Sequence, residues 1–144
     1  MDSIKAKLSS SFKIQDLGEA KYILGIEIKH NHTLQTISLS QSQCSHTVLE
    51  HTGKSACKPV WTPIAHNSQL STTSPDDNQS IPEMVIKGHQ VSYLTVIGSL
   101  MYLMLGTHPD IAFMVGILSH FSAKPNLSHW EAAKRILRYS VLGT

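Results

Sequence analysis

The sequence predicts an α+β fold in which an N-terminal helix and β-hairpin are followed by a polar linker and then by an apolar three-helix segment. Three observations predict this arrangement. Residues 21–29 alternate with the two-residue period of a strand. Residues 53–83 carry four prolines and a long run of Ser, Thr, Asn, Gln and Asp, which is typical of a loop. Residues 91–140 contain three segments of helical length that are rich in apolar side chains.

The first predicted unit, residues 1–53, begins with a short helix over residues 2–13. Asp2 is a residue type that caps helix N-termini. Large apolar side chains then recur every four residues, as they do on one face of a helix; they are Ile4, Leu8 and Phe12. The Asp-Leu-Gly sequence at 16–18 predicts a turn. The cap, the periodicity and the turn together separate this helix from the hairpin that follows.

The hairpin is predicted from two strand-like runs, 21–29 and 34–40. One face of the first run is wholly apolar, which indicates a strand with one buried side. The polar sequence His-Asn-His-Thr at 30–33 supplies the turn. A short helix at about 41–52 completes the unit and ends at Gly53, because glycine suits the left-handed position that follows a helix.

Residues 54–89 are expected to form a loop or linker, and residues 90–144 a helical unit. Its helices are predicted at about 91–105, 109–122 and 128–140. Gly106 ends the first, and Pro109 opens the second at a position that needs no N–H donor. The second helix is apolar on nearly every side, so several neighbours must cover it. The hairpin and two helices cannot easily do so, and we expect an incomplete core that favours self-association.

The last helix has the clearest start signal in the chain. Ser128 and Glu131 have the spacing of a capping box, in which the two side chains satisfy the first free N–H groups of a helix. One face of the helix is apolar and is expected to be buried; it carries Trp130, Ala133 and Leu137. The basic side chains that can reach solvent are those of Lys134, Arg135 and Arg138.

Composition limits the classes of function. The net charge of +2 is too small to argue for nucleic acid by itself. Two cysteines are too few for a disulfide framework, so a reducing compartment is the default. The polar N-terminus predicts no signal peptide, and the apolar run at 96–105 is shorter than the roughly 20 residues of a membrane span. We expect a cytoplasmic or nuclear protein without a membrane partner. Charged residues make up only 15%, which hints that some surface is normally covered.

The residues suggest no catalytic site. Asp76 and Asp77 form the one adjacent carboxylate pair, but they lie in a polar stretch without the rigid strand that a magnesium site needs. A second set of potential metal ligands has a spacing unlike the usual structural zinc patterns; its members are Cys44, His46, His51 and Cys57. His30 and His32 are interpreted as exposed polar residues of the hairpin turn. Neither a dinucleotide-binding fingerprint nor a phosphate-binding loop occurs.

Five separated blocks nevertheless occur in an order that resembles a known family. They are FKIQDLGEAKYILGIEI (12–28), LSQ (39–41), CKPVWTP (57–63), the block that ends in IGSLMYLMLGTHPDIAF (93–113) and HWEAAKRILRY (129–139). In this combination they resemble the C-terminal part of the reverse transcriptase region in copia-type LTR retrotransposon polyproteins. The resemblance covers about residues 4–144, and it is specific because all five blocks recur in one order.

The resemblance implies a place for each part of the chain. The first unit would be the end of the polymerase palm with a primer-grip-like hairpin, and the helical unit would belong to the thumb or connection. Leu24, Gly25 and Ile26 match the stretch near the primer strand, where glycine permits close backbone approach. The intact family enzyme is an RNA-directed DNA polymerase that uses Mg²⁺, and its polyprotein also carries out DNA integration.

The departures from the family bear on activity. The family's Tyr-Val-Asp-Asp-type turn, which holds the catalytic Mg²⁺, belongs upstream of Ile4, and the ribonuclease H domain belongs after the last block. We therefore expect no catalysis and no cofactor for this chain on its own. Three positions also differ from the family's usual residues. Cys44 stands where an aromatic residue is usual, and Leu94 and His108 each stand where Arg is usual. Such changes are typical of a decayed or truncated element.

Two interpretations of the function remain. In the first, the chain is a non-catalytic remnant or fragment of a reverse transcriptase polyprotein, whose partners are the rest of that polyprotein and its primer–template. In the second, it is a retained interaction module that binds nucleic acid or a partner protein weakly. The support for the second is the set of basic residues Lys5, Lys7, Lys13, Lys134, Arg135 and Arg138. A solvated helix face explains the same charges.

Overall fold

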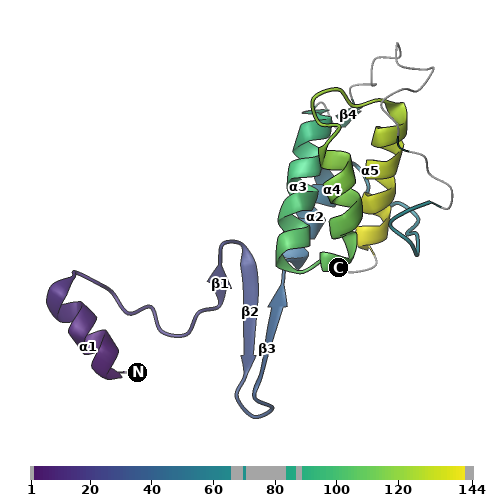
Figure 1. Cartoon of the computed structure of the whole chain (residues 1–144). Coiled ribbons are helices and arrows are strands. Elements are labelled where there is room, and N and C mark those ends of the chain that lie inside the picture. The colour runs from purple at the N-terminus through teal and green to yellow at the C-terminus, as the bar shows by residue number, and fades with distance from the viewer. Residues whose placement is uncertain (1, 66–69, 71–83, 87–88, 142–144) are drawn as a thin grey trace.

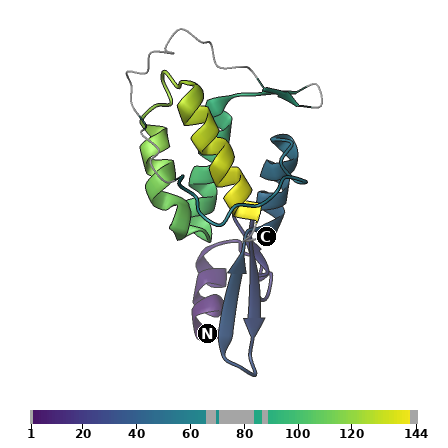
Figure 2. The ribbon, with the colours of Figure 1, turned by 90° about the vertical axis from the view of Figure 1, so that its right-hand side faces the viewer.

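The computed structural model describes residues 2–65, 70, 84–86 and 89–141. Helices and antiparallel strands occur together, which confirms the α+β class. Figures 1 and 2 show a three-stranded sheet at one end of a group of packed helices, with the N-terminal helix on the far side of the sheet from that group in Figure 1. Among the described residues, no helix is both long and apolar enough to cross a membrane.

The N-terminal part contains the predicted helix, α1 (Asp2–Ser11), and a sheet of three strands: β1 (Tyr22–Ile23), β2 (Ile26–Asn31) and β3 (Thr36–Ser40). The hairpin of β2 and β3 is confirmed, with Glu27 opposite Ser40 and Asn31 opposite Thr36. Its turn lies two residues later than predicted, at 32–35, because the Asn31 side chain accepts hydrogen bonds from the Thr33 and Leu34 amides.

The prediction of one continuous strand over 21–29 is wrong. The chain reverses at Leu24 and Gly25, whose φ angles are +50° and +78°, and β1 then pairs with β2 in the antiparallel sense. Positive φ at both central residues is the requirement of a tight two-residue hairpin turn, and glycine meets it without steric cost. The alternating pattern is present on both sides of the turn, so periodicity alone did not show the break.

Helix α2 (Ser42–His51) ends as predicted at Gly53. Gly53 has a φ of +62°, its N–H donates to the Glu50 carbonyl, and the Lys54 N–H donates to the Leu49 carbonyl. These two bonds form a Schellman motif, which satisfies the carbonyl groups left free at the end of a helix.

The predicted linker is only partly without regular structure. A two-stranded sheet of β4 (Met84–Ile86) and β5 (His89–Val91) lies at its end, where the sequence predicted a loop followed directly by a helix. Most of the remaining linker, including Asp76 and Asp77, lies outside the described residues.

The helical part consists of α3 (Tyr93–Gly106), a 3₁₀ turn η1 (Pro109–Ile111), α4 (Ala112–Ser119) and α5 (Leu127–Ser140). Pro109 opens η1, as predicted. The buried apolar residues all come from α2 onward; they are Val48, Leu49, Tyr93, Val96, Ile97, Leu100, Leu103, Ile111, Met114, Val115, Leu118, Trp130, Ala133, Ile136 and Leu137. The helices therefore close a core among themselves, and the expectation of an incomplete core around 109–122 is wrong.

The start of α5 also differs from its prediction. The N-cap is Asn126, whose side chain accepts from the His129 amide at 3.1 Å, while His129 Nδ1 accepts from the Asn126 amide at 3.0 Å. The reciprocal bonding of a capping box is present, but two residues earlier than the Ser128 and Glu131 pattern indicated. Ser128 donates to the capping oxygen, and Glu131 pairs with Lys134 on the surface.

Candidate functional site

The tight turn between β1 and β2 contacts the helical part at one tyrosine. The Tyr102 hydroxyl of α3 donates a hydrogen bond to the Leu24 carbonyl. A Cβ atom built on Gly25 would lie 2.8 Å from the same hydroxyl, closer than side chains normally approach. Gly25 therefore combines a left-handed backbone with a close approach. The family resemblance implied a close approach to the primer strand, which stays a prediction; the close neighbour within the chain is a tyrosine.

Gln41 joins the same region from the start of α2. Its side chain is 2% exposed, its Nε2 donates to the Tyr102 carbonyl at 3.3 Å, and its Oε1 accepts from the Thr107 hydroxyl at 2.9 Å. A Cβ atom on Gly106 would collide with the Gln41 amide group. Gly106 is not among the glycines with a positive φ angle. It is thus explained by space for Gln41 rather than by a left-handed helix end.

These contacts bring three of the five sequence blocks to one junction between the sheet and the helices. The turn at 24–25, Gln41, Tyr102 and the pair 106–107 come from segments up to 78 residues apart. Sequence analysis selected Leu24, Gly25 and Ile26 but missed Gln41 and Tyr102. The sequence shows these two residues only as polar groups in or next to a helix, and this pattern predicts no particular partner for either. Leu24 itself remains 85% exposed, so its side chain is free to meet another molecule.

The other predicted site residues lie on α5 and are partly engaged within the chain. Arg135 Nε donates to the Thr62 carbonyl at 3.1 Å and its Nη2 to the Thr62 hydroxyl at 2.8 Å. Arg138 Nε donates to the Lys58 carbonyl at 2.9 Å, and its own carbonyl accepts from the Val60 amide. These arginines hold the segment 54–65 against α5, a structural role that the sequence did not predict.

Lys134 and the two arginines also line a hollow of about 610 Å³ between α5 and residues 54–65. Lys54 adds a fourth positive side chain, and among the described residues of the lining Glu131 supplies the one carboxylate. Glu131 is paired with Lys134. The hollow carries net positive charge and suits an anionic group better than a cation.

Potential metal ligands gather elsewhere, on the sheet. Within the described part of the chain, one group of three or more His, Cys, Asp or Glu side chains has ligand atoms close enough for a metal ion: Glu19, His30 and His32. Cys44, His46, His51 and Cys57 do not form such a group there. Burial raises the pKa of the Cys44 thiol, which disfavours the thiolate that binds metals.

Comparison with known proteins identifies relatives over nearly the whole chain. The retrovirus-related Pol polyprotein of transposon TNT 1-94 from Nicotiana tabacum is 42% identical over 139 residues, which are 94% of this chain and 10% of that protein. The corresponding polyprotein of transposon RE1 from Arabidopsis thaliana is 38% identical over 92% of this chain and 8% of its own length. An uncharacterized mitochondrial protein of Arabidopsis thaliana is 35% identical over 96% of this chain and 52% of its own length.

No protein-family model matches the sequence, and no solved structure matches it. The chain spans about a tenth of the TNT 1-94 polyprotein and about half of the mitochondrial relative. The aligned region includes the blocks that meet at the junction, since the matches cover more than nine-tenths of the chain. The chain is therefore a homologue of one segment of the retrovirus-related Pol polyproteins of copia-type transposons.

Proposed function

We propose that the chain is a non-catalytic segment of a reverse transcriptase polyprotein, which supplies packing surface and positions the turn at 24–26 toward the primer–template. The observation that carries this proposal is the uneven distribution of exposed apolar side chains. The helices bury a core, whereas residues 4–39 leave eleven large apolar side chains exposed. Such a surface is typical of a segment that another part of a protein covers.

The surface in question is the apolar face of the N-terminal part. Its members come from α1, the coil after it, β1, β3 and the two turns of the sheet; they are Ile4, Leu8, Phe12, Ile14, Leu17, Tyr22, Ile23, Leu24, Leu34, Ile37 and Leu39. Burying a large apolar side chain is worth about 1.5–3 kcal/mol. Its partner is the remainder of the polyprotein, because the matched relatives extend far beyond the aligned region.

The chemistry of nucleotidyl transfer is assigned to that remainder. Two-metal transfer needs carboxylates that converge on the metals. Three described acidic side chains of the N-terminal part are instead paired with bases: Asp16 with Lys5, Glu19 with two histidines and Glu27 with Lys29. This arrangement supports a positioning role for the segment rather than a catalytic one.

Primer extension tests the proposal in two arms. The isolated chain should give no template-dependent synthesis with Mg²⁺ or Mn²⁺. A TNT 1-94 polymerase in which this chain replaces its homologous segment should retain synthesis. The same chimera with Ile37→Lys and Leu39→Lys should lose it, because the apolar face can no longer pack. Synthesis by the isolated chain would refute the non-catalytic assignment.

The second candidate function, weak binding of nucleic acid, is favoured by the positive hollow beside α5. Three basic side chains of α5 would neutralise about three phosphates, which gives a log–log salt slope of about −2 for single-stranded DNA. This slope is measured from the affinities for unrelated oligonucleotides, by fluorescence anisotropy at about 50 mM and about 200 mM salt. Sequence preference that persists at high salt would favour a dedicated binding module over a polymerase segment.

A further inference from the structure

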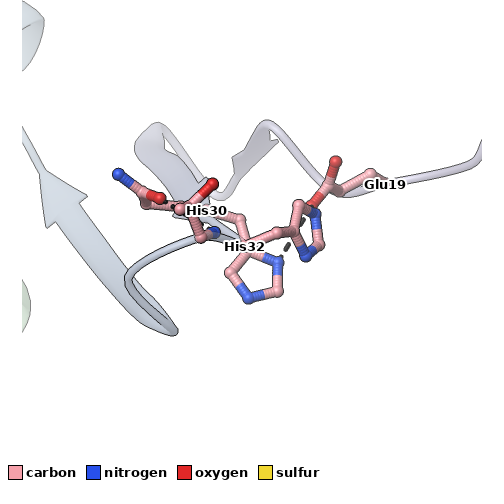
Figure 3. A network of polar contacts seen from close by, with 5 residues as sticks. Glu19, His30 and His32 are labelled. Atoms are coloured by element: carbon pink, nitrogen blue, oxygen red, sulfur yellow. Dashed lines mark hydrogen bonds and ion pairs between the residues drawn. The ribbon is translucent and has the colours of Figure 1, made fainter.

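We propose that Glu19, His30 and His32 form a binding site for a divalent transition-metal ion such as Zn²⁺. Figure 3 shows the three side chains converging at one end of the three-stranded sheet. Glu19 comes from the coil that precedes β1, His30 lies near the end of β2, and His32 lies in the turn that follows. The inference concerns a part of the chain separate from the hollow on α5, and it does not depend on the proposed function.

The geometry of the three ligand atoms carries the proposal. His30 Nδ1 lies 2.9 Å from Glu19 Oε1, and His32 Nε2 lies 3.0 Å from the same oxygen. All candidate ligand atoms are within 4.8 Å of one another. Ligand atoms about 2.1 Å from a tetrahedral zinc are separated by about 3.4 Å. To admit the ion, the two N–O separations would lengthen by about 0.4–0.5 Å and the separation of the two nitrogens would change by at most about 1.4 Å, which side-chain rotation allows.

The spacing of the histidines explains why both reach the same carboxylate. Positions 30 and 32 are two residues apart, so an extended backbone directs their side chains to one side of the sheet. The two rings lie with their centroids 4.1 Å apart. Strand β1 is short and pairs only with Ile26 and Glu27 of β2. Glu19 lies beside the later part of β2, where His30 is located. A His-x-His pair with a carboxylate from another segment is a ligand set that suits zinc.

The chemistry of the donors fits a borderline metal rather than Mg²⁺ or Ca²⁺. Two imidazole nitrogens and one carboxylate oxygen favour Zn²⁺, Ni²⁺ or Cu²⁺, whereas hard cations prefer oxygen ligands alone. A shallow hollow of about 310 Å³ borders Glu19 and His30 and leaves room for a water molecule as the remaining ligand.

A bound ion would fasten the coil before β1 to the hairpin of β2 and β3. That coil is also held by the Lys5–Asp16 pair and by the turn in which the Gly18 amide donates to Asp16. An ion that binds the folded site stabilises the folded form by mass action. Zinc should thus order residues 12–32 without changing the helical core.

Titration of the full chain with Zn²⁺, and with Co²⁺ as a spectroscopic probe, tests the site. We expect one ion per chain and a visible Co²⁺ spectrum of tetrahedral type. His30→Ala and His32→Ala should each weaken binding at least tenfold, which is the loss typical even of an outer-shell partner. The matched control is the double variant His46→Ala/His51→Ala, which removes two exposed histidines of α2 and should bind like the unchanged chain.

A second measurement needs no variant. Zn²⁺ should slow proteolysis within residues 12–21 of the unchanged chain, and removal of the ion with a chelator should reverse the effect. Failure of the unchanged chain to bind Zn²⁺ saturably would overturn the proposal. Equal loss of binding in the α2 control and in the His30 and His32 variants would overturn it as well.

Discussion

At the level of single residues, Gly25 meets two separate constraints. Its φ is +78°, and a Cβ atom would lie 2.8 Å from the Tyr102 hydroxyl. We expect Gly25→Ala to cost roughly 1–2 kcal/mol from the left-handed backbone alone, with the clash added to it. Amide exchange of β1 and β2 should therefore accelerate about tenfold or more, which hydrogen–deuterium exchange measures.

Gly18 provides the matched control for this change. Its φ is +77°, but a Cβ atom there would meet nothing within 4 Å. Gly18→Ala should strain only its own coil and leave the exchange of β2 nearly unchanged. Adding Tyr102→Phe to Gly25→Ala should restore part of the protection, because it removes the hydroxyl that the new methyl group meets. Equal effects of the two glycine changes would show that the junction contact has no energetic role.

A second residue-scale prediction concerns the N-cap of α5. Asn126→Ala removes the oxygen that accepts from the His129 amide, and loss of such a cap typically costs about 1 kcal/mol. Glu131→Ala should change the free energy of unfolding by no more than about 0.5 kcal/mol, because an exposed ion pair contributes little. Urea denaturation of both variants measures the difference. A larger loss of stability in Glu131→Ala than in Asn126→Ala would instead support the capping box of Ser128 and Glu131 that the sequence predicted.

At the level of elements, periodicity located most helices and strands, and errors arose where tertiary contacts decide. The apolar face of Trp130, Ala133 and Leu137 is buried, as the helical spacing predicts. The strand at 21–29 was predicted as continuous because alternation persists through a turn whose positive φ values leave no mark except one glycine. The start of α5 was misplaced because Asn126 and His129 form a box from residue types outside the usual pattern.

The segment 54–65 depends on the guanidinium groups of α5. Arg135→Lys retains the charge but cannot reproduce the two bonds to Thr62, because a lysine lacks the planar fork of donors. Each hydrogen bond contributes about 0.5–1.5 kcal/mol. We expect amide exchange of residues 54–65 to rise roughly fivefold, the factor that corresponds to about 1 kcal/mol.

Lys134→Ala is the control for that experiment. Lys134 lies beside Arg135 but pairs with Glu131 on its own helix, so its loss should leave residues 54–65 protected. Unchanged exchange in Arg135→Lys would mean that the segment is held by the Arg138 contacts alone.

The N-terminal coil and sheet should also respond to acid before the helices do. Hydrogen bonds from Lys5 and then from the Gly18 amide lower the pKa of Asp16, and those from His30 and His32 lower the pKa of Glu19. A carboxyl whose pKa is lower in the folded state stabilises that state above its unfolded pKa, here 3.8 and 4.5. This stabilisation is lost as the pH falls through the lower folded values.

The Gly18 amide is a direct reporter of this loss, because it donates to Asp16 Oδ1 at 2.9 Å. Its NMR shift should move as the pH falls below about 3.8, the unperturbed value for Asp. Asp16→Asn should abolish that movement and leave the acid response of Glu19 in place. Loss of the helical circular dichroism signal at the same pH would contradict the independence of the two parts.

At the level of the whole molecule, the chain divides into a part that closes its own core and a part that does not. The sequence predicted an incomplete core, and it placed the deficiency in the helix at 109–122. In the structure, Ile111, Val115 and Leu118 of that region are fully buried, and Phe113 is its one large apolar side chain exposed by more than a third. Composition gives the amount of apolar surface, but only the packing of α3, α4 and α5 shows which segments cover one another.

The exposed apolar side chains of residues 4–39 predict self-association of the isolated chain. Strand β3 forms one edge of the three-stranded sheet, and an open edge next to apolar side chains favours pairing with another copy. Ile37 and Leu39 of β3 are 63% and 53% exposed. Ile37→Lys/Leu39→Lys should shift the chain toward monomer, since charged side chains on edge strands oppose such pairing. Sedimentation velocity at micromolar concentration measures the shift.

The matched control is Phe113→Lys, which removes a 72% exposed aromatic residue from α4 and should leave association nearly unchanged. A monomeric unchanged chain, or a larger effect of Phe113→Lys, would show that the N-terminal face is not the surface that seeks a partner.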